Sequence, residues 1–148
     1  MTAPPQALDF VLALSRAHGG VVLRMRQDLA AFHGLDFGDF TLLYLLGRRS
    51  DGRLPTNDLA RLLGLSVSEL VRRIVLLEKT GFAERVPEPA IATQRQVMLR
   101  PGGRQLLRSA IATVEAHCKA HVHEILASDL ASAHATLLRM SVHMEPDA

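Results

Sequence analysis

Residues 56–81, TNDLARLLGLSVSELVRRIVLLEKTG, constrain the fold of this chain more than any other stretch. Apolar residues recur at helical spacing on both sides of Gly64, which predicts two short amphipathic helices. Gly64 is expected to end the first helix, because glycine enters the left-handed conformation at little cost. Two helices joined by so short a turn are typical of a helix-turn-helix.

Polar residues mark where the two helices begin. Thr56 is the expected N-cap of the first helix, whose predicted apolar face consists of Leu59, Ala60, Leu62 and Leu63. Ser66 and Glu69 have the spacing of a capping box, so the second helix is expected to begin at Ser66. Glu69 could instead accept a hydrogen bond from a cytosine amino group. We favour the cap, since phosphates would repel an unpaired carboxylate.

The outward face of the second helix carries the functional prediction. Its core stripe is Leu70, Ile74 and Leu77, and the opposite positions hold Val67, Ser68, Val71 and Arg72, with Arg73 at the edge. Small side chains followed by arginine suit a helix in the major groove, where arginine can bind guanine through two hydrogen bonds. A solvated helix face is the alternative, and the two helices alone do not decide between them.

The segment after this helix favours DNA binding. Residues 82–86 and 95–99 are strand-like and flank the proline-rich turn Pro87-Glu88-Pro89, which predicts a β-hairpin. A minimal strand at residues 53–55 is expected to lie beside it. A hairpin directly after a recognition helix forms the wing of a winged helix.

At these residues the chain resembles the MarR/SlyA family of winged-helix transcription regulators. The resemblance lies in Leu62 to Ser66, Leu76 to Phe82, Glu84-Arg85 and the run from Val97 to Gly103. It implies a mainly α fold, a winged helix-turn-helix with a small β-hairpin wing and a helical dimerisation bundle built from both termini. Residues 1–35 and 101–148 would form the dimerisation region, and residues 36–100 the DNA-binding domain.

The resemblance also implies a function. The protein would be a homodimeric repressor that binds an inverted-repeat operator in double-stranded DNA and responds to a small aromatic or phenolic effector. We expect bases to be contacted by Val67, Ser68, Val71 and Arg72. We expect the DNA backbone to be contacted by Thr56, Asn57, Arg61, Ser66, Arg73 and Arg85, with Arg95 acting from the wing. Effector contacts are assigned to Arg16, His18 and Tyr44.

The wing departs from the family pattern. Family members usually carry Asp-x-Arg at the wing tip, whereas this chain has residues such as Ile91 and Thr93 there. The minor-groove contact of a wing arginine is therefore in question. The apolar run Pro89 to Ala92 supports an alternative, a helical dimer that has lost operator binding and acts as a ligand-binding or protein-interaction module.

Long helices are expected on both sides of the winged region. Helical periodicity predicts a helix over residues 6–33, in which Gly19-Gly20 marks either a kink or close packing of another backbone. Asp36 is the expected cap of a helix that ends at Gly47. After the wing we expect a helix over 101–127 and a last helix that is capped by Ser128 and ends near residue 144.

Charge and cysteine content bound the class of protein. Residues 53–104 hold nine Lys and Arg against five Asp and Glu, a basic middle that suits contact with phosphate. The single cysteine, Cys118, excludes an intramolecular disulfide and fits a reducing compartment. Since neither a signal peptide nor an apolar run long enough for a membrane span is evident, we expect a cytoplasmic protein without a membrane partner.

Side chains that could carry chemistry are few. His117 and His121 are four residues apart on one predicted helix, a spacing used by some zinc-responsive members of the family. No completing ligand is evident, so we expect no metal and no cofactor, with His121 and Cys118 on an apolar stripe in the core. No catalytic residue is assigned, because no serine lies in a Gly-x-Ser-x-Gly context and no Walker lysine follows Gly102-Gly103. We therefore do not expect an enzyme.

Overall fold

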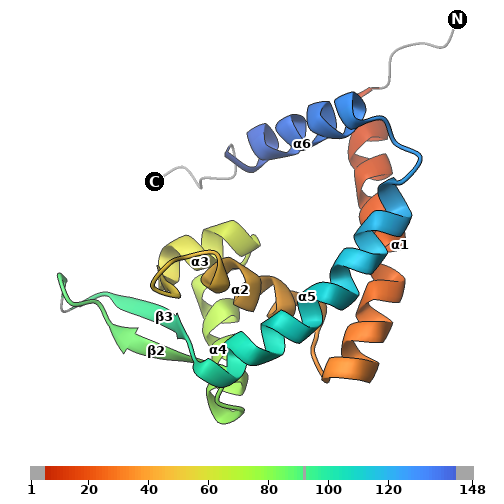
Figure 1. Cartoon of the computed structure of the whole chain (residues 1–148). Coiled ribbons are helices and arrows are strands. Elements are labelled where there is room, and N and C mark those ends of the chain that lie inside the picture. The colour runs from red at the N-terminus through yellow and green to blue at the C-terminus, as the bar shows by residue number, and fades with distance from the viewer. Residues whose placement is uncertain (1–5, 92, 143–148) are drawn as a thin grey trace, which may run out of the picture.

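The computed structural model describes residues 6–91 and 93–142 of the chain. Within these residues it is mainly helical, with one small antiparallel sheet (Figure 1). The elements are α1 (Ala7–His33), α2 (Phe37–Gly47), β1 (Arg53–Pro55), α3 (Thr56–Leu63), α4 (Val67–Lys79), β2 (Ala83–Pro87), β3 (Arg95–Leu99), α5 (Pro101–Val122) and α6 (Ala127–Val142). The predicted fold class, a winged helix-turn-helix with flanking helices, is confirmed.

Local sequence signals set the start of α2, the end of α3 and the start of α4. The Asp36 carboxylate accepts hydrogen bonds from the amides of Gly38 (2.7 Å) and Asp39 (3.2 Å) and so caps α2. Gly64 takes a positive φ of 65° at the end of α3, as expected for the turn. Ser66 and Glu69 form the predicted capping box of α4.

The predicted cap of α3 is wrong. Pro55 occupies the N-cap position, and Thr56 is the first residue of the helix. The Thr56 side chain is 8% exposed, and its hydroxyl donates to the Arg95 carbonyl at 2.9 Å. Thr56 therefore joins α3 to the first residue of β3 instead of closing its own helix end.

The wing is a three-stranded sheet in the order β1-β3-β2. The central strand β3 pairs with both neighbours, and Val97 is opposite Leu54 on one side and Arg85 on the other. Val97 is fully buried, so the sheet is held against the helices by its middle strand. The predicted hairpin and the short strand at residues 53–55 are both confirmed.

A single hydrophobic core joins the elements. Leu42, Leu43 and Leu46 of α2 are fully buried in it, together with Leu70 and Ile74 of the predicted α4 stripe. The core continues into the flanking helices, where it is completed by Met25 and Leu29 of α1 and by Leu107 and Ala110 of α5.

One predicted core residue lies outside this cluster. Leu62 was expected on the apolar face of α3 but is 57% exposed. The face that packs inward is set by Leu59, Ala60 and the half-buried Leu63, and Leu62 turns away from it.

The flanking helices differ from prediction mainly at their ends. α1 runs without a break through Gly19-Gly20, and an added Cβ at either glycine would meet no atom within 4 Å, so no described backbone packs closely there. α5 ends at Val122, where the His123 ring binds the Ala120 carbonyl at 2.7 Å. α6 begins at Ala127, so Ser128 lies inside the helix and is not its cap. The predicted end of the last helix, near residue 144, falls outside the described residues.

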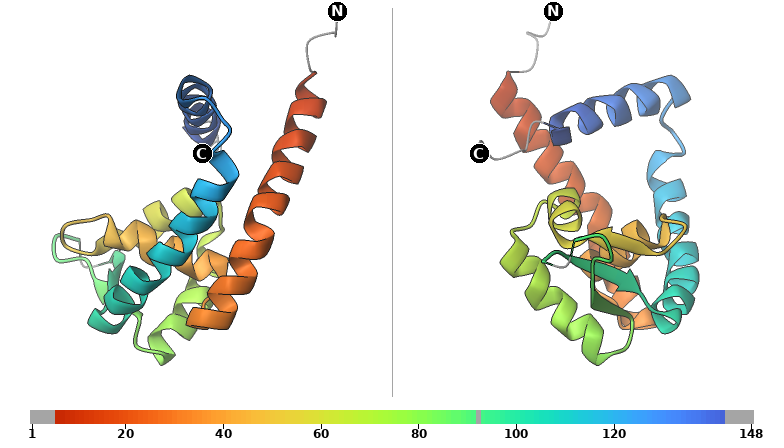
Figure 2. Two further views of the ribbon diagram at one scale, coloured as in Figure 1. Left: turned by 45° about the vertical axis from the view of Figure 1, so that its right-hand side comes forward. Right: turned by 90° about the vertical axis from the view of Figure 1, so that its left-hand side faces the viewer.

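α1 and α5 lie side by side, and α6 crosses beyond them, away from the wing (Figures 1 and 2). Two histidines join α1 to α5: His33 Nε2 lies 2.8 Å from Thr113 Oγ1, and His117 Nε2 lies 2.7 Å from Asp28 Oδ2. Cys118 and His121, which were predicted to be core residues, are exposed, because the inward face of α5 passes through Leu107, Ala110 and Val114.

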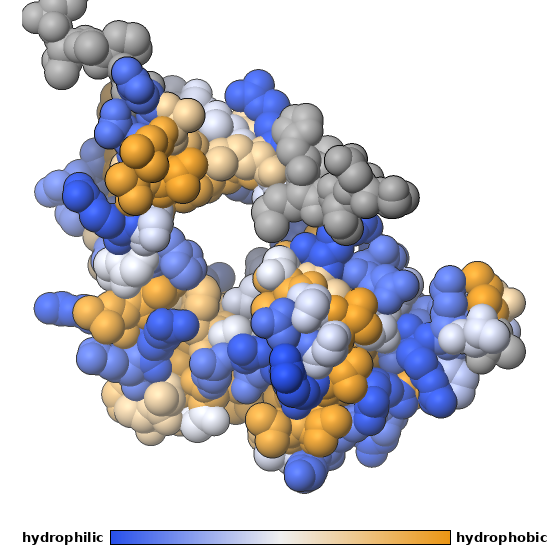
Figure 3. All heavy atoms as spheres, turned by 180° about the vertical axis from the view of Figure 1, so that it is seen from behind, coloured by the Kyte–Doolittle hydropathy of each residue, from blue (hydrophilic) through white to orange (hydrophobic). Residues whose placement is uncertain are grey.

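Apolar side chains remain exposed at the end of the molecule formed by α6 and the N-terminal half of α1, visible at the upper left of Figure 3. The exposed set includes Leu8, Phe10, Val11 and Leu12 of α1 and Leu130, Leu137 and Leu138 of α6. A groove of about 430 Å³ separates the two helices and is lined by Phe10, Ala13, Leu14, Ala17, Ser132, Ala133, Thr136 and Leu137. We call this surface the apolar groove.

Among the described residues, no single helix has both the length and the apolarity to cross a bilayer. α1 and α2 pass that criterion only when taken together, across a bend of 80°.

Candidate nucleic-acid interface

A cleft of about 510 Å³ opens between the start of α3, the first half of α4 and the wing. It is lined by Pro55, Thr56, Asn57, Asp58, Val67, Val71, Arg85, Thr93, Gln94 and Arg95. Six of these residues were predicted from the sequence to contact DNA, although they come from four separate elements. We call this cleft the wing cleft.

The outward face of α4 borders the wing cleft. Val67, Ser68 and Arg72 are exposed, and Val71 is half-buried at the cleft wall. Leu70, Ile74 and Leu77 on the opposite side are buried, which fixes the face that α4 turns to solvent. The predicted rotation of this helix is therefore correct.

Glu69 is a cap. Its carboxylate accepts from the Ser66 amide at 2.9 Å and from the Ser66 hydroxyl at 2.6 Å. These two hydrogen bonds lower the pKa of Glu69. Ser66, predicted to contact the DNA backbone, is exposed at the first turn of α4 with its hydroxyl turned to Glu69.

Arg85 is fixed against the C-terminal turn of α4. Its Nε and Nη2 donate to the two carboxylate oxygens of Glu78 at 3.1 and 3.0 Å, and its backbone amide donates to Glu78 at 2.9 Å. These hydrogen bonds raise the pKa of Arg85 and lower the pKa of Glu78. The guanidinium is thereby held at the edge of the wing cleft.

Arg95 lies at the first position of β3, opposite Pro87, and is exposed in the same cleft. Asn57 is exposed at the start of α3, and Arg61 pairs with Asp58 one turn earlier at 3.0 Å. The lining of the wing cleft thus carries the cationic groups of Arg85 and Arg95 and the amide of Asn57, along with one carboxylate, Asp58.

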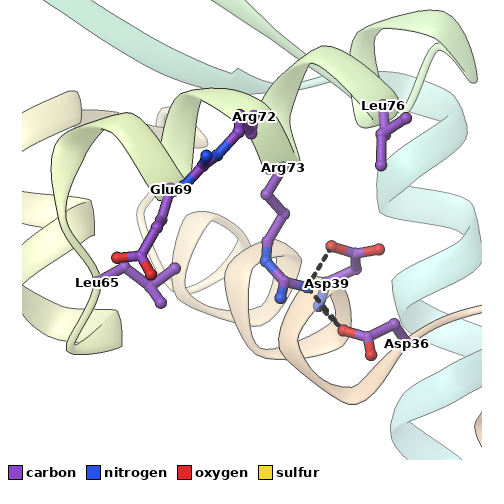
Figure 4. A pocket seen from close by; sticks show the side chains of 7 residues that line it. All are labelled: Asp36, Asp39, Leu65, Glu69, Arg72, Arg73 and Leu76. Atoms are coloured by element: carbon purple, nitrogen blue, oxygen red, sulfur yellow. Dashed lines mark hydrogen bonds and ion pairs between the residues drawn. The ribbon is translucent and has the colours of Figure 1, made fainter.

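Two predicted DNA-backbone contacts have partners inside the protein instead. Thr56 is buried and donates to the Arg95 carbonyl. Arg73 Nη1 donates to Oδ1 of Asp36, the N-cap of α2, at 2.6 Å and to Oδ1 of Asp39 in the first turn of α2 at 2.8 Å. Figure 4 shows the Arg73 side chain directed from α4 toward these two carboxylates. It lines a second cleft, of about 440 Å³, with Asp36, Asp39, Leu65, Glu69, Arg72 and Leu76.

The two carboxylates that hold Arg73 respond differently to burial. Burial raises the pKa of Asp36, but hydrogen bonds from Arg73 and from the Gly38 and Asp39 amides outweigh it, so the pKa falls below the ordinary value. Burial dominates at Asp39 and raises its pKa despite the hydrogen bond from Arg73. Asp36 and Asp39 therefore share the Arg73 guanidinium at a partly buried site.

The wing tip carries no cation. Residues 88–94 contain Glu88 but neither Lys nor Arg. The turn is closed by hydrogen bonds from the Glu88 amide to the Gln94 carbonyl and from the Gln94 amide to the Ile91 carbonyl, both at 3.0 Å. Ile91 is 47% exposed at this tip, and Ala92 lies outside the described residues.

Sequence reasoning missed Thr93, Gln94, Pro55 and Asp58 as lining residues of the wing cleft. The sequence did contain a signal for Thr93 and Gln94, because they directly precede Arg95 in the predicted hairpin and must therefore lie near it. Asp39 was missed as well, because nothing in its local spacing points to a partner 34 residues away.

The residues assigned to an effector or a metal lie elsewhere. Arg16 and His18 are exposed on α1, and Tyr44 is exposed on α2, with its ring stacked on Phe40 at 6.0 Å between centroids. None of these three lines the clefts described above. His117 is hydrogen-bonded to Asp28 and His121 is exposed, and no three His, Cys, Asp or Glu residues among positions 6–91 and 93–142 are grouped as a metal site.

Comparison with protein families finds one match. The MarR family model matches residues 33–90, which span α2, the helix-turn-helix and the start of the wing. No curated protein sequence matches this chain.

Solved structures of MarR family regulators share the fold over nearly the whole chain. CouR from Rhodococcus jostii RHA1, solved with p-coumaroyl-CoA, has a TM-score of 0.82 at 23% identity and covers 97% of this chain and 100% of its own. AbsC from Streptomyces coelicolor has a TM-score of 0.78 at 20% identity, covering 97% and 98%. Sco3205 from the same organism, solved with DNA, has a TM-score of 0.77 at 18% identity, covering 99% and 94%.

Proposed function

We propose that this chain, whose residues 33–90 match the MarR family model, is a DNA-binding transcriptional regulator of that family, a repressor that binds an inverted-repeat operator as a homodimer. The observation that carries this proposal is the wing cleft. In this cleft Val67 and Val71 of α4 lie across from Arg85 and Arg95 of the wing. A helix that presents small side chains and an arginine next to cations suits a major groove flanked by phosphates.

We assign base contacts to Val67, Ser68, Val71 and Arg72. The two valines can pack against thymine methyl groups, and Arg72 can bind guanine through its two terminal nitrogens. Backbone contacts are assigned to the exposed residues Asn57, Arg61, Ser66, Arg85 and Arg95, of which Asn57, Arg85 and Arg95 line the wing cleft. Thr56 and Arg73 are left out, since both side chains have partners inside the fold.

A second copy of the chain would cover the apolar groove. The groove joins exposed leucines and a phenylalanine from both ends of the chain, and burial of such a surface drives association. We propose that residues 1–35 and 101–148 form this dimerisation region and that residues 36–100 bind DNA. A repressor of this kind works on the chromosome, so we place it in the cytoplasm and assign it no catalytic activity.

We propose a small aromatic or phenolic effector as the signal. CouR, similar in fold, was solved with the CoA ester of a phenolic acid. Arg16 and His18 offer cationic and hydrogen-bonding groups on α1, and Tyr44 offers an exposed ring on α2. We retain these three residues as the proposed effector contacts.

The wing tip favours a second candidate function. Its exposed Ile91 and the lack of a cation at residues 88–94 suit a protein or ligand contact better than a minor groove. In this case the chain would be a helical dimer that does not bind operators, a ligand-binding or protein-interaction module.

Titration of the purified protein against duplex DNA from its own promoter region separates the two candidates. For a regulator, we expect binding whose affinity falls steeply between about 50 and 200 mM salt. Arg72→Ala should remove about 1–3 kcal/mol of the preference for operator over random duplex, because the lost contact reads a base. Arg49→Ala removes the same charge from the turn after α2, outside the wing cleft, and should leave that preference unchanged. Absent or salt-insensitive binding would favour the interaction module.

A further inference from the structure

We infer that Arg73 is a positioning residue: it fixes the rotation of α4 against α2 through Asp36 and Asp39, and operator recognition depends on this fixation. The inference rests on the proposed DNA-binding function for its main readout. It replaces the phosphate contact that the sequence predicted for this arginine.

The contact has the geometry of a shared cation. One terminal nitrogen, Nη1, lies 2.6 Å from Asp36 Oδ1 and 2.8 Å from Asp39 Oδ1. The Arg73 side chain is 31% exposed and that of Asp39 is 21% exposed. Exposed single ion pairs contribute little to stability, but a partly buried guanidinium bound to two carboxylates forms a network with a defined orientation.

Gly38 makes the room for this guanidinium. A Cβ at position 38 would lie 2.6 Å from Arg73 Nη1 and 2.8 Å from Arg73 Cζ. The guanidinium therefore rests directly on the backbone of the first turn of α2, between the two carboxylates. Any side chain at this position would force Arg73 out of its place.

The site is electrostatically unfavourable for a cation unless both acids are present. The first turn of a helix carries a partial positive charge, which repels a guanidinium. Asp36 also caps α2, so its charge is already shared with the Gly38 and Asp39 amides. Asp39 supplies the second negative charge, and together the two carboxylates outweigh the helix end.

The contact lies immediately behind the face of α4 that is assigned to bases. Arg72 is the adjacent residue, and Figure 4 shows it extending along α4 toward Glu69 while Arg73 points to α2. Adjacent residues on a helix are about 100° apart, so fixing Arg73 fixes the direction of Arg72 and of Ser68 one turn before it. The buried stripe of Leu70, Ile74 and Leu77 sets which face of α4 is exposed, so loss of the contact would allow only a small rotation of α4 and would not unfold the domain.

The test compares Arg73→Met, Asp39→Asn and Gly38→Ala in the full-length protein, with operator and random duplexes titrated at several salt concentrations. We expect each variant to lose roughly three- to tenfold in operator affinity, with unchanged affinity for random duplex and an unchanged salt slope. The double variant Arg73→Met/Asp39→Asn should be no worse than either single variant, because both remove the same contact. Arg73→Lys, which keeps the charge, should recover part of the loss.

A phosphate contact predicts the opposite pattern and would overturn the inference. Arg73→Met would then weaken binding to both duplexes and reduce the salt slope by about one unit. Asp39→Asn would tighten binding, since it releases the arginine for DNA. Gly38→Ala would do the same or change nothing.

Denaturant unfolding without DNA keeps this inference separate from the proposed function. Gly19→Ala is the matched control, because a Cβ there meets no atom and alanine favours the helix, so it should raise the unfolding midpoint. Gly38→Ala should fail to raise it, and Arg73→Met and Asp39→Asn should be non-additive. If wild-type protein binds no DNA while these unfolding results hold, the proposed function fails and the contact between α4 and α2 stands. Additive unfolding effects would refute the contact itself.

Discussion

Arginine side chains around α4 differ in how the fold holds them. Arg73 is bound to the N-terminal end of α2 and Arg85 to the end of α4, whereas Arg72 is exposed on α4 and Arg95 is exposed at the wing cleft. A side chain already oriented by a carboxylate loses less conformational entropy when it meets a ligand, but its charge is partly neutralised. We therefore expect the exposed arginines to gain more Coulomb energy on binding DNA, and the arginines paired with carboxylates to hold the surrounding elements in position.

Arg95→Ala should weaken operator binding less than Arg72→Ala does. Arg95 lies opposite Pro87 in the last strand pair before the wing tip, and we expect it to contact a phosphate and not a base. We expect the salt slope to fall by at most about one unit and the base preference to stay unchanged in the same titrations. If Arg95→Ala were as damaging as Arg72→Ala and also abolished a preference for A·T-rich flanks, Arg95 would be a minor-groove contact.

Single residues were predictable where their partners are close in sequence. The capping roles of Asp36, Ser66 and Glu69 follow from spacings of two or three residues and are confirmed. The sequence did not indicate the protein partners of Thr56 and Arg73, because these partners lie 39 and 37 residues away in the chain. A local pattern cannot distinguish a polar side chain that faces a ligand from one that faces another element.

Among the elements, the wing is attached to the helix-turn-helix through two of its strands, β2 and β3. Arg85 on β2 is bound to Glu78 at the end of α4, and the Arg95 carbonyl on β3 accepts from Thr56 at the start of α3. The wing therefore moves with the helix-turn-helix as one body. These attachments add to the pairing of β3 with β1 and to the burial of Val97, which already join the hairpin to the rest of the fold.

Stability at low pH should depend on the Glu78 attachment. Hydrogen bonds from Arg85 lower the pKa of Glu78 below its ordinary value of 4.5, so the ionised form stabilises the fold. This contribution is complete above pH 4.5 and is lost as the pH falls through the lowered value. The free energy of unfolding should therefore drop less between about pH 6 and pH 3 in Glu78→Gln than in wild type.

Glu115→Gln, a change at an exposed position of α5, serves as the control for that measurement. Its unfolding curve should follow the wild-type pH dependence. A Glu78→Gln variant that retained the full wild-type slope would show that the attachment of β2 to α4 adds nothing to the folded state.

Element boundaries were predictable where a periodic stripe met a strong breaker. Gly64 and Gly81 both take positive φ at the turns that end α3 and follow α4, and the strands fall within one residue of the expected ranges. The end of α5 was placed five residues too late, because an apolar stripe that continues to Ile125 looks helical without the turn that begins at His123. Leu62 was misplaced since an eight-residue helix gives too few turns to define its buried face.

At the scale of the whole molecule, the flanking helices are buried at one end and exposed at the other. The C-terminal half of α1 and the first half of α5 belong to the main core, while the opposite end of α1 and all of α6 keep large apolar side chains exposed. The sequence predicted stripes on these helices but could not tell which part is buried within one chain. That division arises only once α1 and α5 pack against each other.

Leu137→Glu should disrupt the proposed homodimer. Leu137 lines the apolar groove, and a carboxylate there would have to be buried without a partner. Analytical ultracentrifugation should show a dimer for wild type and a shift toward monomer for the variant. Leu62→Glu, which places the same charge on an exposed leucine of α3, should remain dimeric, and equal behaviour of the two variants would move the interface away from the groove.

Because α1 is unbroken, its length determines how far a change of tilt at one end moves the other end. A helix of 27 residues is about 40 Å long at 1.5 Å per residue. Because its far end shares the core with the recognition helix, α1 acts as a lever arm in the proposed dimer. A tilt of about 5° at the dimer end displaces the other end by about 3.5 Å, close to the 3.4 Å between successive nucleotides of one DNA strand. In the proposed dimer, such a tilt would displace α4 along the DNA by about the spacing of one base pair.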